Sequence, residues 1–224
     1  MNIPTSDDDL RSRFSSLLGE IQSGLETMGS LVLENLDRAG IAMAESRLDL
    51  VPEIKNADLA INEMYTRLDT STFETIARQA PVASDLRFLV SATRMLYEIE
   101  RSGDLVVNCA KMLEREGGFP DNPLLRARIA DIVAAVGSVF GQCVTAIAEL
   151  PADAGITLDA ADDVVDDLVS ILYTEIGQQA DEIGLTTAVA LTRVGRFLER
   201  IADHAVNIGE HVTYIVTAKF PNAD

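Results

Sequence analysis

The chain has 224 residues, 47% of them apolar and 24% charged, which is enough to bury one large core or two modest ones. Its 36 acidic and 18 basic side chains give a formal net charge of −18 at pH 7. Because such a surface repels phosphate backbones and the sequence shows no basic stripe, binding to nucleic acid is not expected.

Apolar residues recur at spacings of three and four along most of the chain, and strand signals are nearly absent. The pattern predicts an all-α protein with six long helices. In the first half we expect helices over residues 8–45, 52–78 and 81–116. Pro52 is acceptable in the first turn of the second helix, and Pro81 is expected to begin the third. Gly117 and Gly118 are a stop signal for the third helix.

The segment Gly-Gly-Phe-Pro-Asp-Asn-Pro, residues 117–123, is the clearest linker in the chain. Three more helices are expected after it, over residues 124–149, 158–181 and 186–219. The first of these is apolar enough to be considered as a membrane span. Its polar residues, such as Asp131 and Gln142, favour a buried bundle helix instead, so no transmembrane segment is expected.

The N-terminal ten residues are acidic and contain no apolar signal core, which predicts a protein without a secretory signal. The two cysteines, Cys109 and Cys143, lie in apolar helical patterns and not in a C-x-x-C pair. This pattern is typical of buried, reduced thiols in a cytosolic protein.

An internal repeat follows from two matching strings. Glu100–Asn108 and Glu199–Asn207 both read E-R-x-x-D-x-x-x-N, and the upstream segment Ala57–Asn62 resembles Ala161–Asp166. We therefore predict two tandem, similar three-helix bundles with antiparallel neighbouring helices. The expected domains are residues 1–118 and 119–224.

Carboxylate and amide side chains gather on single helical faces within each repeat. Glu100, Asp104 and Asn108 are spaced i, i+4, i+8 and span only about 80° around the helix axis. The second repeat has the same pattern, which Glu210 extends, and in both repeats the preceding helix supplies a further pair one turn apart. The members outside the first string are Asp58, Asn62, Asp162, Asp166, Glu199, Asp203, Asn207 and Glu210.

Two interpretations of these acidic faces remain open. Carboxylates at i, i+4 repel each other, so their repetition in apolar surroundings favours a site for hard cations such as Mg, Mn, Ca or Fe. Alternatively, each string is an ordinary solvated row of ion pairs. His204 and His211 are interpreted as satisfied or solvent-exposed residues and not as ligands. No nucleophile motif, phosphate-binding loop or E-x-x-H string is present, so no catalytic residue is assigned and an enzyme is not expected.

Three longer strings carry a family resemblance. Residues 77–87, Ala-Arg-Gln-Ala-Pro-Val-Ala-Ser-Asp-Leu-Arg, resemble the signature A-x-Q-x-P-V-A-x-D-L-R of the PhoU family of phosphate-transport accessory proteins. Residues 198–212 are similar to that family's ending L-E-R-I-x-D-H-x-x-N-I-x-E, and Met28–Val32 fits its M-G-x-L-V element. The match extends over nearly the whole chain.

The resemblance implies a negative regulator of phosphate uptake and of the phosphate-starvation response. Such a protein is expected to be a cytoplasmic homodimer that links the ATPase subunit of a phosphate ABC transporter (PstB-like) to a sensor histidine kinase (PhoR-like). It also implies multinuclear metal clusters, with Fe, Mn, Mg or Zn all possible, and no organic cofactor. The ligands carried over are Asp58, Glu100 and Asp104 for a first site, and Asp162, Asp166, Glu199 and Asp203, with Asn207 and Glu210 as outer members, for a second.

The two predicted sites differ in charge. Asn62 stands where the second repeat has Asp166, and Lys55 stands where it has Asp159. We therefore expect the second site to bind metal more tightly. Two other functions remain as alternatives, a metal-free structural or oligomerising adaptor and a multi-metal carboxylate hydrolase. In the signature loop, Asp85 and Arg87 either form a local polar contact or dock a partner.

Overall fold

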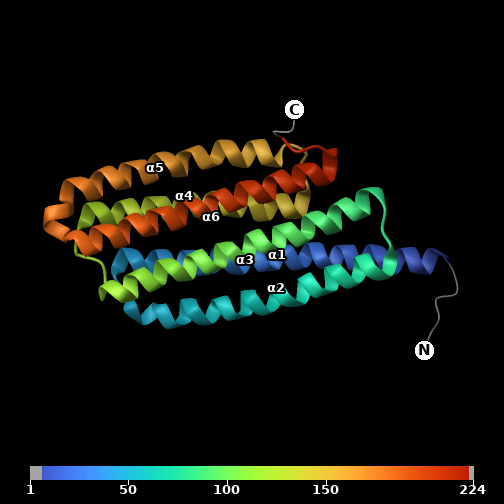
Figure 1. Cartoon of the computed structure of the whole chain (residues 1–224), viewed down its shortest axis with the longest axis horizontal. Helices are drawn as coiled ribbons and strands as arrows, with labels where there is room; N and C mark the ends of the chain where they lie inside the picture. The colour runs from blue at the N-terminus through green and yellow to red at the C-terminus, as the bar shows by residue number, and fades with distance from the viewer. Residues whose placement is uncertain (1–6, 222–224) are drawn as a thin grey trace.

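The computed structural model describes residues 7–221 and consists of six long helices and one short 3-10 turn (Figure 1). Residues 1–6, part of the segment in which no signal core is expected, lie outside the described residues. The helices are α1 (Asp7–Glu45), α2 (Val51–Gln79), α3 (Ala83–Glu116), α4 (Pro123–Glu149), α5 (Ala154–Ile183) and α6 (Leu185–Thr217), and the 3-10 turn η1 is Leu48–Leu50.

Each half of the chain forms one three-helix bundle, and the two bundles lie side by side (Figure 1). Within the bundles, α2 packs against α1 and α3, and α5 packs against α4 and α6. Between the bundles, α3 lies along α6 and α1 lies along α4. The prediction of an all-α fold with two similar three-helix bundles is confirmed.

The hydrophobic core runs without a break through both bundles. Leu36 and Met95 of the first repeat and Phe140 and Leu198 of the second are fully buried and belong to the same cluster. The contact between α3 and α6 is the most extensive helix pair in the molecule, exceeding any pair within a repeat. The two repeats are therefore stabilised largely by each other.

Most helix ends agree with the sequence signals. Gly117 has φ 68° and ends α3 as expected. The side chain of Asn122 accepts a hydrogen bond from the backbone N–H of Leu125 at 3.1 Å and so caps the start of α4. Helix α5 begins at Ala154, four residues before the predicted Leu158.

The prediction that Pro81 begins the third helix is wrong by two residues. Val82 is extended, with φ −129° and ψ 160°, and α3 begins at Ala83. Arg87 forms no ion pair with Asp85 among the described side chains, and its Nη2 instead donates to the backbone carbonyl of Ile215 on α6 at 3.5 Å. This contact links the first turns of α3 in the first repeat to α6 in the second.

Helix α4 is the only helix in the described part of the chain that is long and apolar enough to cross a membrane. Its apolar side chains, among them Ile132 and Val136, are buried against α1, α5 and α6, as expected for a bundle helix. Cys109 and Cys143 are free and buried, as predicted, and burial raises the pKa of both thiols. Neither thiol is therefore poised to react.

Candidate metal-binding carboxylate clusters

The first carboxylate cluster consists of Asp58 on α2 and Glu100 and Asp104 on α3. Asp58 is only 8% exposed, and its Oδ1 has no hydrogen-bond partner among the described residues. Burial, and then the negative charge of Asp104, raise the pKa of Asp58. The Nδ2 of Asn62 donates to the other oxygen of Asp58 at 3.0 Å. The helix pair α2–α3 therefore buries one carboxylate beside another, as the spacing predicted.

Positive side chains border this first cluster. The Nη1 of Arg101 lies 2.9 Å from Oδ2 of Asp104, and the charge of Lys111 lowers the pKa of Asp58. Burial and Asp104 raise the pKa of Glu100. The cluster therefore offers carboxylate oxygens whose charge is already partly compensated.

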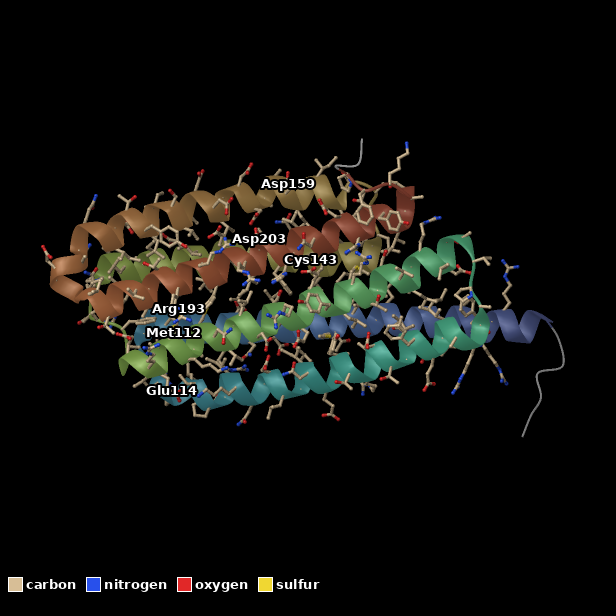
Figure 2. The ribbon with its side chains drawn as sticks, in the orientation of Figure 1. Met112, Glu114, Cys143, Asp159, Arg193 and Asp203 are labelled. Atoms are coloured by element: carbon tan, nitrogen blue, oxygen red, sulfur yellow. The ribbon has the colours of Figure 1, made fainter. Side chains whose placement is uncertain are left out.

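The second carboxylate cluster consists of Asp162 and Asp166 on α5 and Glu199 and Asp203 on α6 (Figure 2 labels Asp203). Burial, followed by the charges of Asp166 and Asp203, raises the pKa of Asp162 to about 7. Its Oδ1 is buried without a hydrogen-bond partner in the described structure. Burial and Asp203 also raise the pKa of Asp166.

Glu199 completes the second cluster from α6. Burial raises its pKa, as do Asp166 and Asp203, while Arg196 lowers it. Arg196 forms an ion pair with Glu199 one turn away on the same helix. The second cluster therefore contains one carboxylate more than the first. The repulsion among its carboxylates is correspondingly greater.

Asn207 points away from the position expected for an outer ligand. Its Nδ2 donates to Oε2 of Glu98 on α3 at 3.4 Å, which places it at the junction between the repeats. The backbone of Glu210 lies against the start of α5, where a Cβ on Gly155 would come within 3.2 Å of the Glu210 Cα. The structure therefore gathers the four central residues of the second site but directs Asn207 elsewhere.

Glu98 is a functional candidate that the sequence did not reveal. Its carboxylate contacts Nδ1 of His204 on α6, and both side chains are largely buried. Although burial opposes it, the hydrogen bond from His204 lowers the pKa of Glu98. No signal in the local sequence marks this glutamate, because its partner lies in the other repeat.

The two histidines are buried and not solvent-exposed. His211 packs edge-on against Phe220 with ring centroids 5.6 Å apart, and burial together with Arg94 lowers its pKa. Nε2 of His204 and Nδ1 of His211 have no hydrogen-bond partner among the described residues. The prediction that His204 is satisfied within the protein is confirmed for its Nδ1 atom, which contacts Glu98.

The donor chemistry of both clusters fits a hard cation. Asp58 and Asp162 each place one unpartnered oxygen in a buried position beside further carboxylates, where a cation would offset the repulsion. Within the described side chains, no group of three or more such ligands converges on a single point. The oxygens are thus suited to a cation but are not arranged around one.

Comparison with known proteins agrees with this architecture. The PhoU domain profile matches residues 25–113 and again residues 129–212. A PhoU homologue of the phosphate-specific transport system from Synechocystis is 31% identical, covering 93% of each chain. PhoU homologue 2 from Mycobacterium tuberculosis is 30% identical, covering 95% of this chain and all of that protein.

Two solved structures are similar over nearly the whole chain. The PhoU regulatory protein from Streptococcus pneumoniae superposes with a TM-score of 0.85 at 26% identity, covering 94% of this chain and 100% of that one. PhoU from Pseudomonas aeruginosa also gives 0.85, at 27% identity and 92% coverage of this chain. With two PhoU domains, relatives of this length and the same six-helix arrangement, the chain belongs to the PhoU family of phosphate-transport accessory proteins.

Proposed function

We propose that this protein is a negative regulator of phosphate uptake and of the phosphate-starvation response. It acts as a metal-binding helical adaptor between the ATPase subunit of a phosphate ABC transporter and a sensor histidine kinase. The names of its relatives, accessory proteins of the phosphate-specific transport system, support the transporter side of this proposal. A cytoplasmic location, a homodimer and the absence of catalysis are parts of the same proposal.

One observation carries the metal-dependent part of the proposal. Each repeat holds a carboxylate cluster on its second and third helices, and each cluster contains a buried oxygen without a hydrogen-bond partner among the described residues, on Asp58 and on Asp162. Burying unpaired carboxylates is costly, so a structure that does it twice in equivalent places suggests a bound cation. The residues that would hold the cation are those of the first and second carboxylate clusters. A bound multivalent cation supplies open coordination positions to carboxylate or phosphate oxygens of a partner.

A metal-free adaptor is the second candidate, and one observation favours it. Among the described side chains, no three ligands converge as they do in a preformed metal site. In this case the acidic faces themselves would contact basic surfaces of a partner.

The test begins with protein purified without chelator and without a histidine tag. Its metal content is measured by elemental mass spectrometry, and its binding to the purified transporter ATPase is measured before and after metal removal. We expect several metal equivalents and binding that falls when the metal is removed. A Glu199→Ala, Asp203→Ala double variant should lose both, since it removes the α6 half of the second carboxylate cluster.

The matched control is Asp181→Ala with Glu182→Ala, which removes the same charge from two exposed residues at the end of α5. This control should keep both metal and binding. Metal-stripped protein that binds the ATPase as well as loaded protein would establish the metal-free adaptor. If neither form binds the ATPase or the histidine kinase, the adaptor function is rejected.

A further inference from the structure

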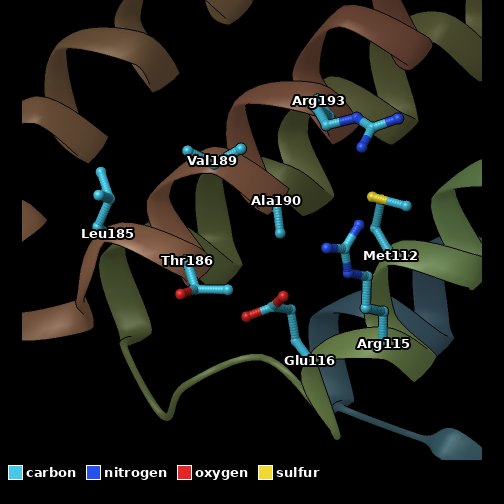
Figure 3. A pocket seen from close by; sticks show the side chains of 8 residues that line it. All are labelled: Met112, Arg115, Glu116, Leu185, Thr186, Val189, Ala190 and Arg193. Atoms are coloured by element: carbon cyan, nitrogen blue, oxygen red, sulfur yellow. The ribbon is translucent and has the colours of Figure 1, made fainter.

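A pocket of about 220 Å³ opens where the C-terminal end of α3 meets the N-terminal end of α6 (Figure 3). It lies at the junction of the two repeats and apart from both carboxylate clusters. Its walls combine apolar and positively charged side chains. They are Met112, Arg115, Glu116, Leu185, Thr186, Val189, Ala190 and Arg193.

Two arginines of this pocket lack an acidic partner. Figure 3 shows Arg115 of α3 and Arg193 of α6 with Met112 between them. Neither guanidinium forms an ion pair with a carboxylate of the described side chains, although acidic residues outnumber basic ones 36 to 18. Arg193 only lies over the ring of Phe197, 5.8 Å from its centroid. Two neighbouring arginines without a carboxylate partner give this pocket a local positive charge on an otherwise acidic surface.

The acidic residue of the pocket is already engaged. Oε2 of Glu116 accepts a hydrogen bond from the hydroxyl of Thr187 at 3.3 Å. The first turn of α6 has Gly184 as its N-cap and no side-chain cap, so its backbone N–H groups add partial positive charge. The pocket therefore favours a negatively charged group.

Exposed apolar side chains form the rim of the same pocket. Leu185 is 79% exposed and Val189 is 52% exposed, and both border the walls formed by Met112 and Ala190. Leu185 is the most exposed large apolar side chain among the described residues, and a ligand that covered it would remove apolar surface from water. A ligand that fits must therefore carry apolar and acidic groups close together.

We propose that this pocket binds a short segment of a partner protein in which an apolar side chain stands next to an acidic one. The apolar side chain packs on Met112 and Val189, and the carboxylate pairs with Arg115 and Arg193, whose planar groups suit bidentate binding. The pocket is smaller than the roughly 300–1,000 Å³ of small-molecule sites and matches a single anchoring side chain. The proposal rests on the adaptor function in that it gives one partner its docking site, but its test uses no transporter or kinase.

The experiment follows the NMR signals of the Met112 methyl group and of the Leu185 and Val189 amides during peptide titration. The probe is the blocked peptide acetyl-Gly-Asp-Leu-Asp-Gly-amide, and the comparison peptide has Lys in place of both Asp residues. We expect the acidic peptide to shift these signals in a saturable way. The Lys peptide should leave them unchanged. An Arg115→Gln, Arg193→Gln double variant should bind the acidic peptide about tenfold or more weakly.

The matched control is Arg67→Gln with Arg78→Gln, which removes two exposed arginines of α2 and should bind the peptide as the unchanged protein does. The absence of shifts with the acidic peptide, or equal shifts with the Lys peptide, would overturn the proposal. Equal shifts with inorganic phosphate would make the pocket a small-anion site instead. Shifts that depend only on protein concentration would make it an interface between two copies. Since none of these outcomes involves the ATPase, failure here is distinct from failure of the adaptor function.

Discussion

Glu98 and His204 contact each other across the junction of the two repeats, although they lie 106 residues apart in the sequence. Asn207 donates to the same carboxylate, so one side chain of α3 holds two side chains of α6. This polar contact is embedded in the most extensive helix pair of the molecule. This polar contact fixes the position of α3 along α6.

Replacing Glu98 by Ala should lower the free energy of unfolding by about 1–3 kcal/mol at pH 7, because it leaves His204 and Asn207 without their acceptor. The pKa of Glu98 is lowered in the folded protein, so its contribution is present above the ordinary value of 4.5. That contribution is lost as the pH falls through the lower, folded-state pKa. Urea unfolding at pH 7 and at pH 3.5 measures both effects.

The control for Glu98 is Glu74→Ala, which removes an exposed glutamate that pairs only with Arg78 on its own helix. Its effect should stay below about 0.5 kcal/mol. Equal destabilisation by the two variants would show that the junction contact between Glu98 and His204 adds nothing specific.

Asp162 should make the metal-free protein less stable as the pH rises. Its pKa is raised from 3.8 to about 7 in the folded state, so folding favours the protonated form. The stabilisation is complete below pH 3.8 and is lost as the pH rises through about 7. Thermal unfolding from pH 5 to pH 8 in the presence of chelator should show this decline, and Asp162→Asn should flatten it. Asp163→Asn, which changes an exposed neighbour, should leave the slope as it is.

The two carboxylate clusters should differ in metal content. Asp203→Ala removes a ligand from the second cluster, which has four carboxylates, whereas Asp104→Ala acts on the first, which has three and lies near Lys111. Elemental mass spectrometry should therefore find a greater loss of metal in Asp203→Ala. Equal losses in the two variants would contradict this ranking of the sites.

Two glycines in helices should respond oppositely to alanine. At Gly209 a Cβ would lie 2.5 Å from Leu158 Cδ1 and 3.0 Å from the carbonyl oxygen of Ala154, so Gly209→Ala must push α5 away from α6. We expect a destabilisation of about 1–3 kcal/mol, which exceeds the gain in helix propensity. At Gly177 no atom lies within 4 Å of the added Cβ, and Gly177→Ala should stabilise by about 0.5–1 kcal/mol. Chemical denaturation of both variants checks the pair, and the same sign in both would contradict the packing argument.

The sequence was sufficient to predict what depends on local periodicity. The apolar spacing predicted all six helices, and the glycines after Glu116 marked the end of α3. The repeat of E-R-x-x-D predicted which carboxylates would face each other within each bundle. These features depend on residues a few positions apart, or on a pattern that occurs twice.

The sequence could not predict contacts that depend on how the two bundles meet. Glu98 looks like any solvated helical glutamate until α6 is placed beside it, and the same placement directs Asn207 away from the second carboxylate cluster. The sequence also contained no sign that Arg115 and Arg193 would line one pocket, because the two arginines lie far apart along the chain and form no basic stripe. The beginning of α3 was misplaced because proline is compatible with the first turn of a helix and with the extended connection that is found.

The unbroken core between the repeats resembles the interface of a dimer whose two halves are joined in one polypeptide. Residues 1–118 alone would expose the apolar faces of α1 and α3 that α4 and α6 now cover, so this half-chain is expected to pair with a second copy of itself. In such a pair both carboxylate clusters would be identical. Joining the halves through Gly117–Pro123 allows the two clusters to diverge, with Asn62 in one and Asp166 in the other, while their distance from each other stays fixed.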